Sequence, residues 1–267
     1  MTYVYPVISR RASGVSVGIN LNPNNACNWR CIYCQVPDLK RGSAPAIDLA
    51  LLEHELRTFL HELLHGRFML EKVPAEARRI NDIALSGNGE PTSAKEFDKV
   101  IELIGQITHD LSLPKELKLV LITNGSLIDR TYVQKGLKLM ANLNGEVWFK
   151  LDSVTEDGRK RINNTRMSLK KVFSNIKLAV SLCPTWLQTC VFETDGMPPS
   201  EAETNAYLKF LDCLRQEGIA ISGILLYGLA RPSLQPEAPR LSKVSMEWME
   251  SYAARIKKLG LEVRIHP

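Results

Sequence analysis

The segment ACNWRCIYCQ, at residues 26–35, places three cysteines close together in the chain. They are Cys27, Cys31 and Cys34, and Tyr33 stands directly before the last of them. Structural zinc sites use four nitrogen or sulfur ligands, and no histidine stands near this group in the sequence. Three thiolates suit a 4Fe-4S cluster whose fourth iron stays open for another ligand. The spacing therefore predicts an iron-sulfur cluster, with a structural zinc or a chance grouping as the alternatives.

A second stretch, HELLH at residues 61–65, fits the H-E-x-x-H pattern that binds zinc on one face of a helix. Around it, an apolar stripe at helical spacing consists of Leu49, Leu52, Leu56, Phe59, Leu60 and Leu63. Helical geometry turns His61 and His65 nearly to the opposite side. We expect both histidines to face solvent and Gly66 to end the helix, which disfavours a metallopeptidase.

The chain that positions these motifs has 267 residues, of which 45% are hydrophobic and 24% are charged. This length predicts one globular domain over residues 1–267. Short apolar runs that predict strands are GVSVGIN, RINDIALS, KLVLITN, EVWFKLD, TWLQTCVF and ISGILLYG. Helical periodicity falls between them, near residues 48–65, 94–108, 129–142, 168–181, 200–217 and 243–259.

This alternation predicts an α/β fold in which crossover helices join parallel strands, a partial TIM barrel of about (β/α)6. LEVRI near the C-terminus adds a terminal strand, so the core spans about residues 15–230 and a last helix and strand span 243–265. Two helices are expected to begin at capping boxes, which are Ser93 with Glu96 and Ser200 with Glu203.

Polar loops follow the predicted strands. Cys27 follows the first strand, SGNGEPT the second and TNGS the third, and KLDS closes the fourth. Parallel α/β folds bind their ligands at the carboxyl ends of the strands. We therefore expect these loops to converge on one ligand-binding mouth.

The order CxxxC, one residue, an aromatic residue and a cysteine resembles the signature of the radical S-adenosylmethionine (radical SAM) superfamily. The match runs residue for residue through Cys27, Cys31, Tyr33 and Cys34, and the resemblance extends over about residues 15–230. It implies two cofactors, a 4Fe-4S cluster and SAM, and an external one-electron donor of flavodoxin or ferredoxin type. It further implies that reductive cleavage of SAM yields a 5′-deoxyadenosyl radical that abstracts hydrogen from a substrate.

The same resemblance assigns SAM-binding roles. SGNGEPT resembles the glycine-rich Gly-Glu motif of the family, which would place the SAM methionine at Gly87, Asn88, Gly89, Glu90 and Pro91. Many members have glycine where this chain has Asn88. The ribose and the methionine carboxylate would meet Asn124, Lys150, Asp152 and Ser153. Simpler roles stay open, because Asn124 suits a turn and Lys150 and Asp152 share a strand face that suits a salt bridge.

Within the superfamily, the chain looks most like uncharacterised relatives of the wyosine-type tRNA-modifying enzymes. That likeness rests on YPVISRR, CIYCQV, SGNGEPT and LYGLARPS. Those enzymes condense a tRNA guanosine with pyruvate carbons and bind a second cluster through cysteines upstream of the radical motif. This chain has no cysteine before Cys27, so their activity is not transferred to it. Tyr227 and Arg231, at the end of the sixth strand, are candidates for substrate contact.

Three functions stay open on the sequence. The first is a radical SAM enzyme acting on a small molecule or nucleoside, and the second is a radical SAM modifier of tRNA or activase of a protein. The third is a non-catalytic iron-sulfur or zinc module, which would bind no SAM. A macromolecular substrate would favour a basic rim, for which the nearest candidates are Arg10, Arg11, Lys40, Arg41 and Arg231.

Composition and hydropathy bear on the partners and the cellular compartment of the protein. A net charge of +5 permits a polyanionic partner without indicating one. No stretch reaches the roughly 18 apolar residues of a spanning helix, and the N-terminus lacks the apolar core of a signal peptide, so we expect a cytoplasmic protein without membrane contact. Cys183, Cys190 and Cys213 are irregularly spaced, which favours buried thiols over a second cluster.

Overall fold

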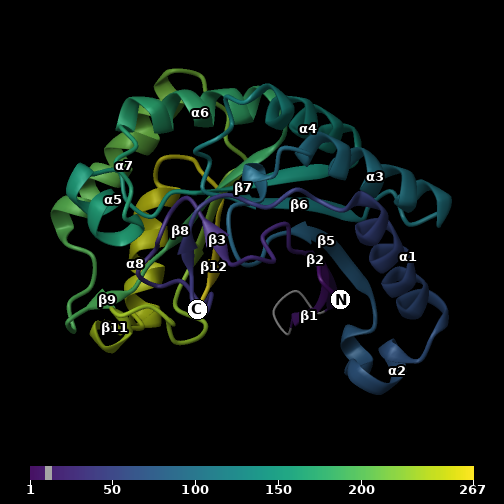
Figure 1. Cartoon of the computed structure of the whole chain (residues 1–267). Helices are drawn as coiled ribbons and strands as arrows, with labels where there is room; N and C mark the ends of the chain where they lie inside the picture. Colours follow the sequence, from purple (N-terminus) through teal and green to yellow (C-terminus); the bar gives the residue numbers. More distant parts are fainter. Residues whose placement is uncertain (10–13) are drawn as a thin grey trace. The chain divides into compact units, whose positions relative to one another are not determined.

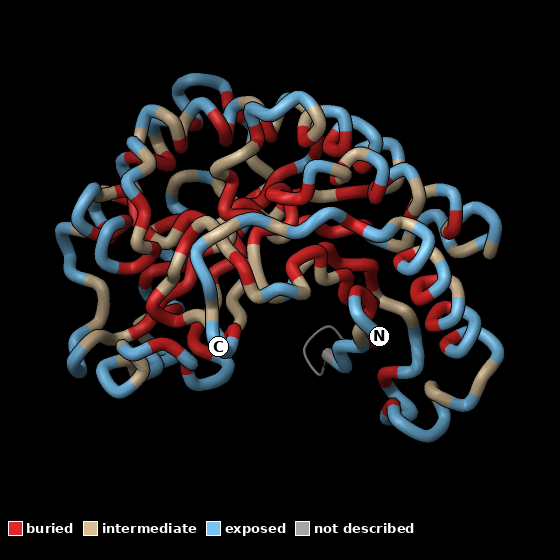
Figure 2. The backbone as a smooth tube through the Cα atoms, in the orientation of Figure 1, coloured by how far each residue is buried: buried red, intermediate tan, exposed pale blue. Residues whose placement is uncertain are grey.

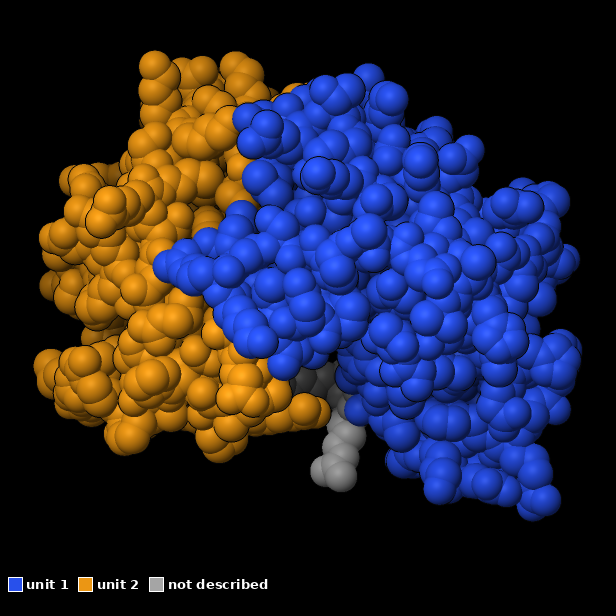
Figure 3. All heavy atoms as spheres, viewed as in Figure 1, with its two compact units in different colours: residues 1–28, 40–123, 127–147 blue, residues 29–39, 124–126, 148–267 orange. Residues whose placement is uncertain are grey.

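A computed structural model of the chain describes residues 1–9 and 14–267 (Figure 1). The chain divides into two compact units (Figure 3). Unit 1 comprises residues 1–28, 40–123 and 127–147, and unit 2 comprises residues 29–39, 124–126 and 148–267. The single domain expected over the whole chain stays a prediction.

The sheet of unit 1 has four neighbouring strands, in the order β1 (Val4–Ser9), β2 (Gly14–Ile19), β5 (Ile80–Leu85) and β6 (Lys118–Thr123). β2, β5 and β6 are parallel, as predicted, whereas β1 pairs antiparallel with β2. The sequence does not predict β1, because Pro6 interrupts its apolar run. Proline is tolerated here because β1 is the first strand in the order and a terminal strand need not donate every N–H.

The helices described in unit 1 are α1 (Leu49–His65), α2 (Phe68–Lys72), α3 (Phe97–Asp110) and α4 (Thr131–Asn142). Each long helix buries one apolar stripe; in α3 it consists of Phe97, Val100, Ile101, Ile104 and Ile107. Burial follows the strands and one face of these helices (Figure 2). Among the described helices of the chain, none has the length and apolar composition needed to cross a membrane.

β7 (Gly145–Lys150) begins in unit 1 and ends in unit 2, where the order continues with β8 (Thr185–Cys190), β10 (Gly223–Tyr227) and β12 (Val263–His266). β8, β10 and β12 are parallel, so the terminal strand joins the sheet as predicted. The helices described in unit 2 are α5 (Glu156–Asn163), α6 (Leu169–Leu182), α7 (Glu201–Gln216) and α8 (Met246–Lys257). The fold is α/β with parallel strands, as predicted.

The structure differs from the sequence predictions at two helices. α5 was not predicted, because EDGRKRIN has one apolar side chain, Ile162, and therefore no apolar stripe. The capping box at Ser93 is wrong: Glu96 precedes α3, and the Ser93 hydroxyl instead donates to the Glu90 carbonyl at 2.6 Å. The start of α7 is confirmed, since Ser200 Oγ accepts the N–H of Glu203 at 3.2 Å.

Candidate functional site

The cysteine motif divides between the units. Cys27 ends the short strand β3 (Ala26–Cys27) in unit 1, and Cys31 and Cys34 lie in a loop of unit 2. β3 pairs in parallel with β4 (Lys40–Arg41), and the carbonyl of Cys27 accepts the N–H of Gly42 at 3.0 Å. The backbone at Cys27 is therefore fixed by pairing with residues 40–42, which follow the cysteine loop in the sequence. Within the described residues of either unit, no three Cys, His, Asp or Glu side chains are gathered in one metal-binding group.

The loop SGNGEPT packs directly against the segment that leads to the first cysteine. Gly87 has a φ of +135°, and a Cβ there would stand 2.6 Å from Asn20 Oδ1. A Cβ on Gly89 would stand 2.1 Å from the carbonyl oxygen of Ala26. Asn20 Oδ1 also accepts the N–H of Asn88 at 3.0 Å. The close approach of the two segments therefore requires both glycines.

Glu90 is only 2% exposed, and its carboxylate is held in one orientation. Oε1 accepts the N–H of Thr92 at 3.1 Å, the Thr92 hydroxyl at 2.5 Å and the Thr123 hydroxyl at 2.6 Å. Pro91 begins the 3-10 turn η2 (Pro91–Ser93), which this carboxylate caps. Asn88 Nδ2 donates to a neighbouring asparagine oxygen at 2.7 Å. These contacts preorganise the loop, and its SAM-binding role stays a prediction.

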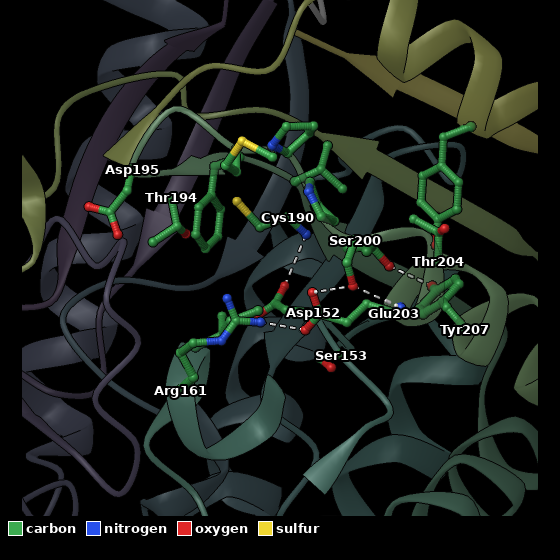
Figure 4. A pocket seen from close by; sticks show the side chains of 18 of the residues that line it. Asp152, Ser153, Arg161, Cys190, Thr194, Asp195, Ser200, Glu203, Thr204 and Tyr207 are labelled. Atoms are coloured by element: carbon green, nitrogen blue, oxygen red, sulfur yellow. Dashed lines mark hydrogen bonds and ion pairs between the residues drawn. The ribbon is translucent and has the colours of Figure 1, made fainter. Parts of the chain in front are cut away.

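In unit 2, a partly buried polar network centres on Asp152. Its Oδ2 accepts the Tyr33 hydroxyl at 2.5 Å and Asn163 Nδ2 at 2.7 Å. Its Oδ1 accepts the N–H of Cys190 at 2.9 Å (Figure 4). Asn163 Nδ2 also lies 3.2 Å from Cys31 Sγ. One carboxylate therefore links the aromatic residue of the cysteine motif to a side chain that contacts the second cysteine.

Lys150 is placed beside this network but is not paired as a simple salt bridge. Its Nζ donates to the Tyr227 hydroxyl at 2.7 Å and stands 5.1 Å and 5.3 Å from the ring centres of Tyr33 and Tyr227. Burial alone would lower the pKa of Lys150, but the negative charge of Asp152 and the contact with Tyr227 raise it above its ordinary value. Lys150 is thus a half-buried ammonium beside two aromatic rings.

The Cys31 thiol is poorly suited to ionise by itself. Burial and the charge of Asp152 raise the pKa of Cys31 to about 11, while Lys150 and the hydrogen bond from Asn163 oppose that rise. A thiol must lose its proton to bind a metal, so a metal bound here would have to displace that proton. A thiol with such a raised pKa is a poor free nucleophile.

A segment far along the chain holds the cysteine loop in place. We call residues 231–237 the strap. The Ser233 hydroxyl donates to the carbonyl of Ile32 at 2.7 Å, and the N–H of Leu234 donates to the carbonyl of Cys34 at 2.9 Å. Sequence reasoning missed these residues, since RPS reads only as a turn.

The two ends of the strap are also tied to the cysteine loop. The Arg231 carbonyl accepts Gln35 Nε2 at 3.2 Å, whereas the Arg231 side chain is exposed. Glu237 forms a two-pronged ion pair with Arg30, with N–O distances of 2.9 Å and 2.6 Å. The side chains of this pair are about a quarter exposed, so it is partly shielded from water.

Two further predicted SAM contacts have local structural roles. Asn124 is buried, and its Oδ1 accepts the N–H of Ser126 at 3.0 Å, which is the turn that the sequence allowed. Ser153 Oγ accepts the N–H of Thr155 at 3.3 Å, just before α5. Both therefore shape loops after β6 and β7, and contact of either with SAM stays a prediction.

A cavity of about 320 Å³ opens beside the Asp152 network (Figure 4). Asp152, Cys190 and Phe192 line it, and Phe192 also packs on Tyr33 with ring centres 5.6 Å apart. At its polar side, Arg161 pairs with Glu203. The cavity is large enough for a small molecule.

The remaining candidate histidines and cysteines differ in their exposure to solvent. His61 and His65 are exposed, as predicted. Cys183 and Cys190 are buried thiols, as predicted, whereas Cys213 is exposed because it lies on the outer face of α7. Within residues 1–9 and 14–267, none of these cysteines forms a disulfide bond.

The basic rim proposed from the sequence is tested only in part. Lys40 and Arg41 are exposed in unit 1, and Arg231 is exposed in unit 2. Arg10 and Arg11 lie outside the described residues. A shared basic surface therefore stays a prediction.

Comparison with known proteins identifies a family. The family model described as the Radical SAM superfamily matches residues 21–211. GTPase Obg of Brachyspira hyodysenteriae is 32% identical over 52% of this chain but only 17% of its own length. UPF0026 protein slr1464 of Synechocystis sp. is 25% identical over 82% of this chain and 74% of its own length. The chain thus spans about a sixth of the first relative and about three quarters of the second.

Solved structures share the fold. A radical SAM methyltransferase from Sphaerobacter thermophilus has a TM-score of 0.64 and 12% identity, covering 98% of this chain and 68% of its own. TYW1 with a bound lysine-pyruvate adduct has a TM-score of 0.60 and 13% identity, covering 92% of this chain and 74% of its own. At such identities the likeness is one of fold, and it confirms the predicted α/β architecture.

Proposed function

The chain belongs to the Radical SAM superfamily, and from that membership we propose an enzyme that binds a 4Fe-4S cluster through Cys27, Cys31 and Cys34. The donor set supports this assignment, because three thiols leave one iron open. The observation that carries it is the Asn163 amide 3.2 Å from Cys31 Sγ, in a network that also fixes Tyr33 of the motif. Hydrogen bonds to ligand sulfur are typical of tuned iron-sulfur sites.

When bound, the cluster and SAM would supply a 5′-deoxyadenosyl radical that abstracts hydrogen from the substrate. The protein's residues would bind and orient these groups. Glu90, held by Thr92 and Thr123, would pair with the methionine ammonium. Gly87 and Gly89 would allow close approach of the backbone. The remaining proposed SAM contacts are Tyr33, Asn88, Pro91, Asn124, Lys150, Asp152 and Ser153.

The substrate proposed here is a small molecule or nucleoside. The cavity beside Asp152 supports that size class, with a volume of about 320 Å³. Tyr227 and Arg231 stay proposed substrate contacts; the first is engaged by Lys150 and the second has an exposed side chain. A flavodoxin- or ferredoxin-type protein would supply the electron, and the proposed compartment is the cytoplasm.

The experiment that tests the SAM site is Glu90→Gln in the anaerobically reconstituted protein. A glutamine oxygen can keep the hydrogen bonds from Thr92 and Thr123, so the change removes mainly the charge. Loss of a charge-assisted bond, worth roughly 1.5–3 kcal/mol, should weaken SAM binding by about 10- to 100-fold. Iron content should stay unchanged.

Formation of 5′-deoxyadenosine from SAM, with dithionite as reductant, is measured on the same samples. The parent should form it, and Glu90→Gln should form it only at raised SAM concentrations. Unchanged SAM affinity in the variant would leave SGNGEPT as a turn and remove it from the proposed site. A parent that binds iron but forms no 5′-deoxyadenosine would overturn the proposed reaction.

A further inference from the structure

Asn163 is the last residue of α5 and is only 1% exposed. Its backbone is held by the helix and by the N–H of Arg30, which donates to the Asn163 carbonyl at 3.3 Å. Ile32, two residues after Arg30, is held in the same way, since its N–H donates to the carbonyl of Ile162 at 2.8 Å. The end of α5 therefore runs beside Cys31 on both sides of that residue.

The direction of the Asn163 amide follows from its partners. Asp152 Oδ2 accepts the Tyr33 hydroxyl, and a carboxylate can only accept, so the group 2.7 Å away must be the Asn163 NH2 and not its oxygen. The same nitrogen lies 3.2 Å from Cys31 Sγ. One N–H is thus used by Asp152, and the other points to sulfur.

Asp152 is itself fixed on its other oxygen, which accepts the N–H of Cys190 at 2.9 Å. The amide of Asn163 cannot rotate away from Cys31 without breaking its bond to this carboxylate. The donor is therefore oriented before any ligand binds, and its contact with sulfur needs no rearrangement.

We infer that Asn163 is a positioning residue that donates a hydrogen bond to the Cys31 ligand and thereby raises the reduction potential of the bound cluster. The inference rests on the proposed function, because it requires the cluster at Cys27, Cys31 and Cys34. A reduced cluster carries one more negative charge than an oxidised one. The hydrogen bond from the N–H to its sulfur is therefore stronger in the reduced state. Removal of the donor consequently makes reduction harder.

The test is a redox titration of the reconstituted protein followed by electron paramagnetic resonance (EPR). Asn163→Leu keeps nearly the same shape without the donor. At a fixed potential its ratio of reduced to oxidised cluster should fall about tenfold, which is about 59 mV for a one-electron couple. Asn164→Gly is the matched control. Asn164 has a left-handed φ of +49°, which glycine adopts readily. The side chain of Asn164 donates to the Arg30 carbonyl rather than to sulfur.

A second measurement detects the hydrogen-bond donor directly. In parent protein labelled with 15N only at asparagine side-chain amides, the reduced cluster should show a 15N hyperfine coupling, and Asn163→Leu should lose it. An unchanged potential in Asn163→Leu with the cluster present, or no such coupling in the parent, overturns the inference and leaves the proposed function standing. A parent that forms no 4Fe-4S cluster refutes the proposed function itself.

Discussion

The cysteine loop and helix α1 both carry spacings typical of metal sites, but their surroundings differ. In unit 2, Tyr33 and Cys31 contact a partly buried network through Asp152 and Asn163. On α1, the rings of His61 and His65 stand 5.0 Å apart and both side chains are exposed.

The acidic residues that accompany the two motifs are used differently as well. Glu62, the glutamate of HELLH, accepts the N–H groups of Arg67 and Phe68 at 2.9 Å and 3.1 Å, which closes the turn after α1. Asp152 instead orients side chains around Cys31. A ligand pattern therefore indicates metal chemistry when buried partners hold its side chains, since metal ligands depend on such outer contacts.

The largest expected effect comes from Cys31→Ala. Loss of one of three ligands should abolish the cluster and all formation of 5′-deoxyadenosine, whereas Cys213→Ala, at an exposed position on α7, should leave both intact. Iron analysis and product assay on the two variants check this. Equal loss in both would mean that general thiol chemistry, not the motif, holds the iron.

A smaller effect is expected from the strap. Ser233→Ala removes a hydroxyl that donates to the Ile32 carbonyl, a bond worth about 1 kcal/mol. Release of cluster iron to a chelator should quicken roughly fivefold. Ser174→Ala, which alters an exposed serine of α6, serves as control. If the two variants release iron equally fast, the strap does not support the cysteine loop.

The double change His61→Ala with His65→Ala should have the smallest effect. Both side chains are exposed, and surface substitutions of this kind alter the free energy of unfolding by less than about 0.5 kcal/mol. Iron content, SAM affinity and Tm should match those of the parent. Loss of a bound metal on this change would place a metal site on α1 and reverse the comparison.

The sequence predicts the part of the site that is local in the chain. Strand ends and glycine loops follow from short patterns, so β5, β6 and the loop at Gly87 and Gly89 are found where expected. The partners of the cysteine loop are not local. Asn163 lies 132 residues from Cys31, and Ser233 lies 201 residues from Ile32. No spacing rule links such pairs, and α5 lacks the apolar stripe that would have revealed it.

The proposed function depends on a cluster at the cysteine loop with one iron open to SAM. The most direct test is the EPR spectrum of the anaerobically reduced protein, which should hold about four irons, before and after addition of SAM. A cluster with an open iron should give a reduced 4Fe-4S signal whose shape changes when SAM binds. A signal that SAM leaves unaltered, or a protein that takes up zinc and no cluster, would contradict it.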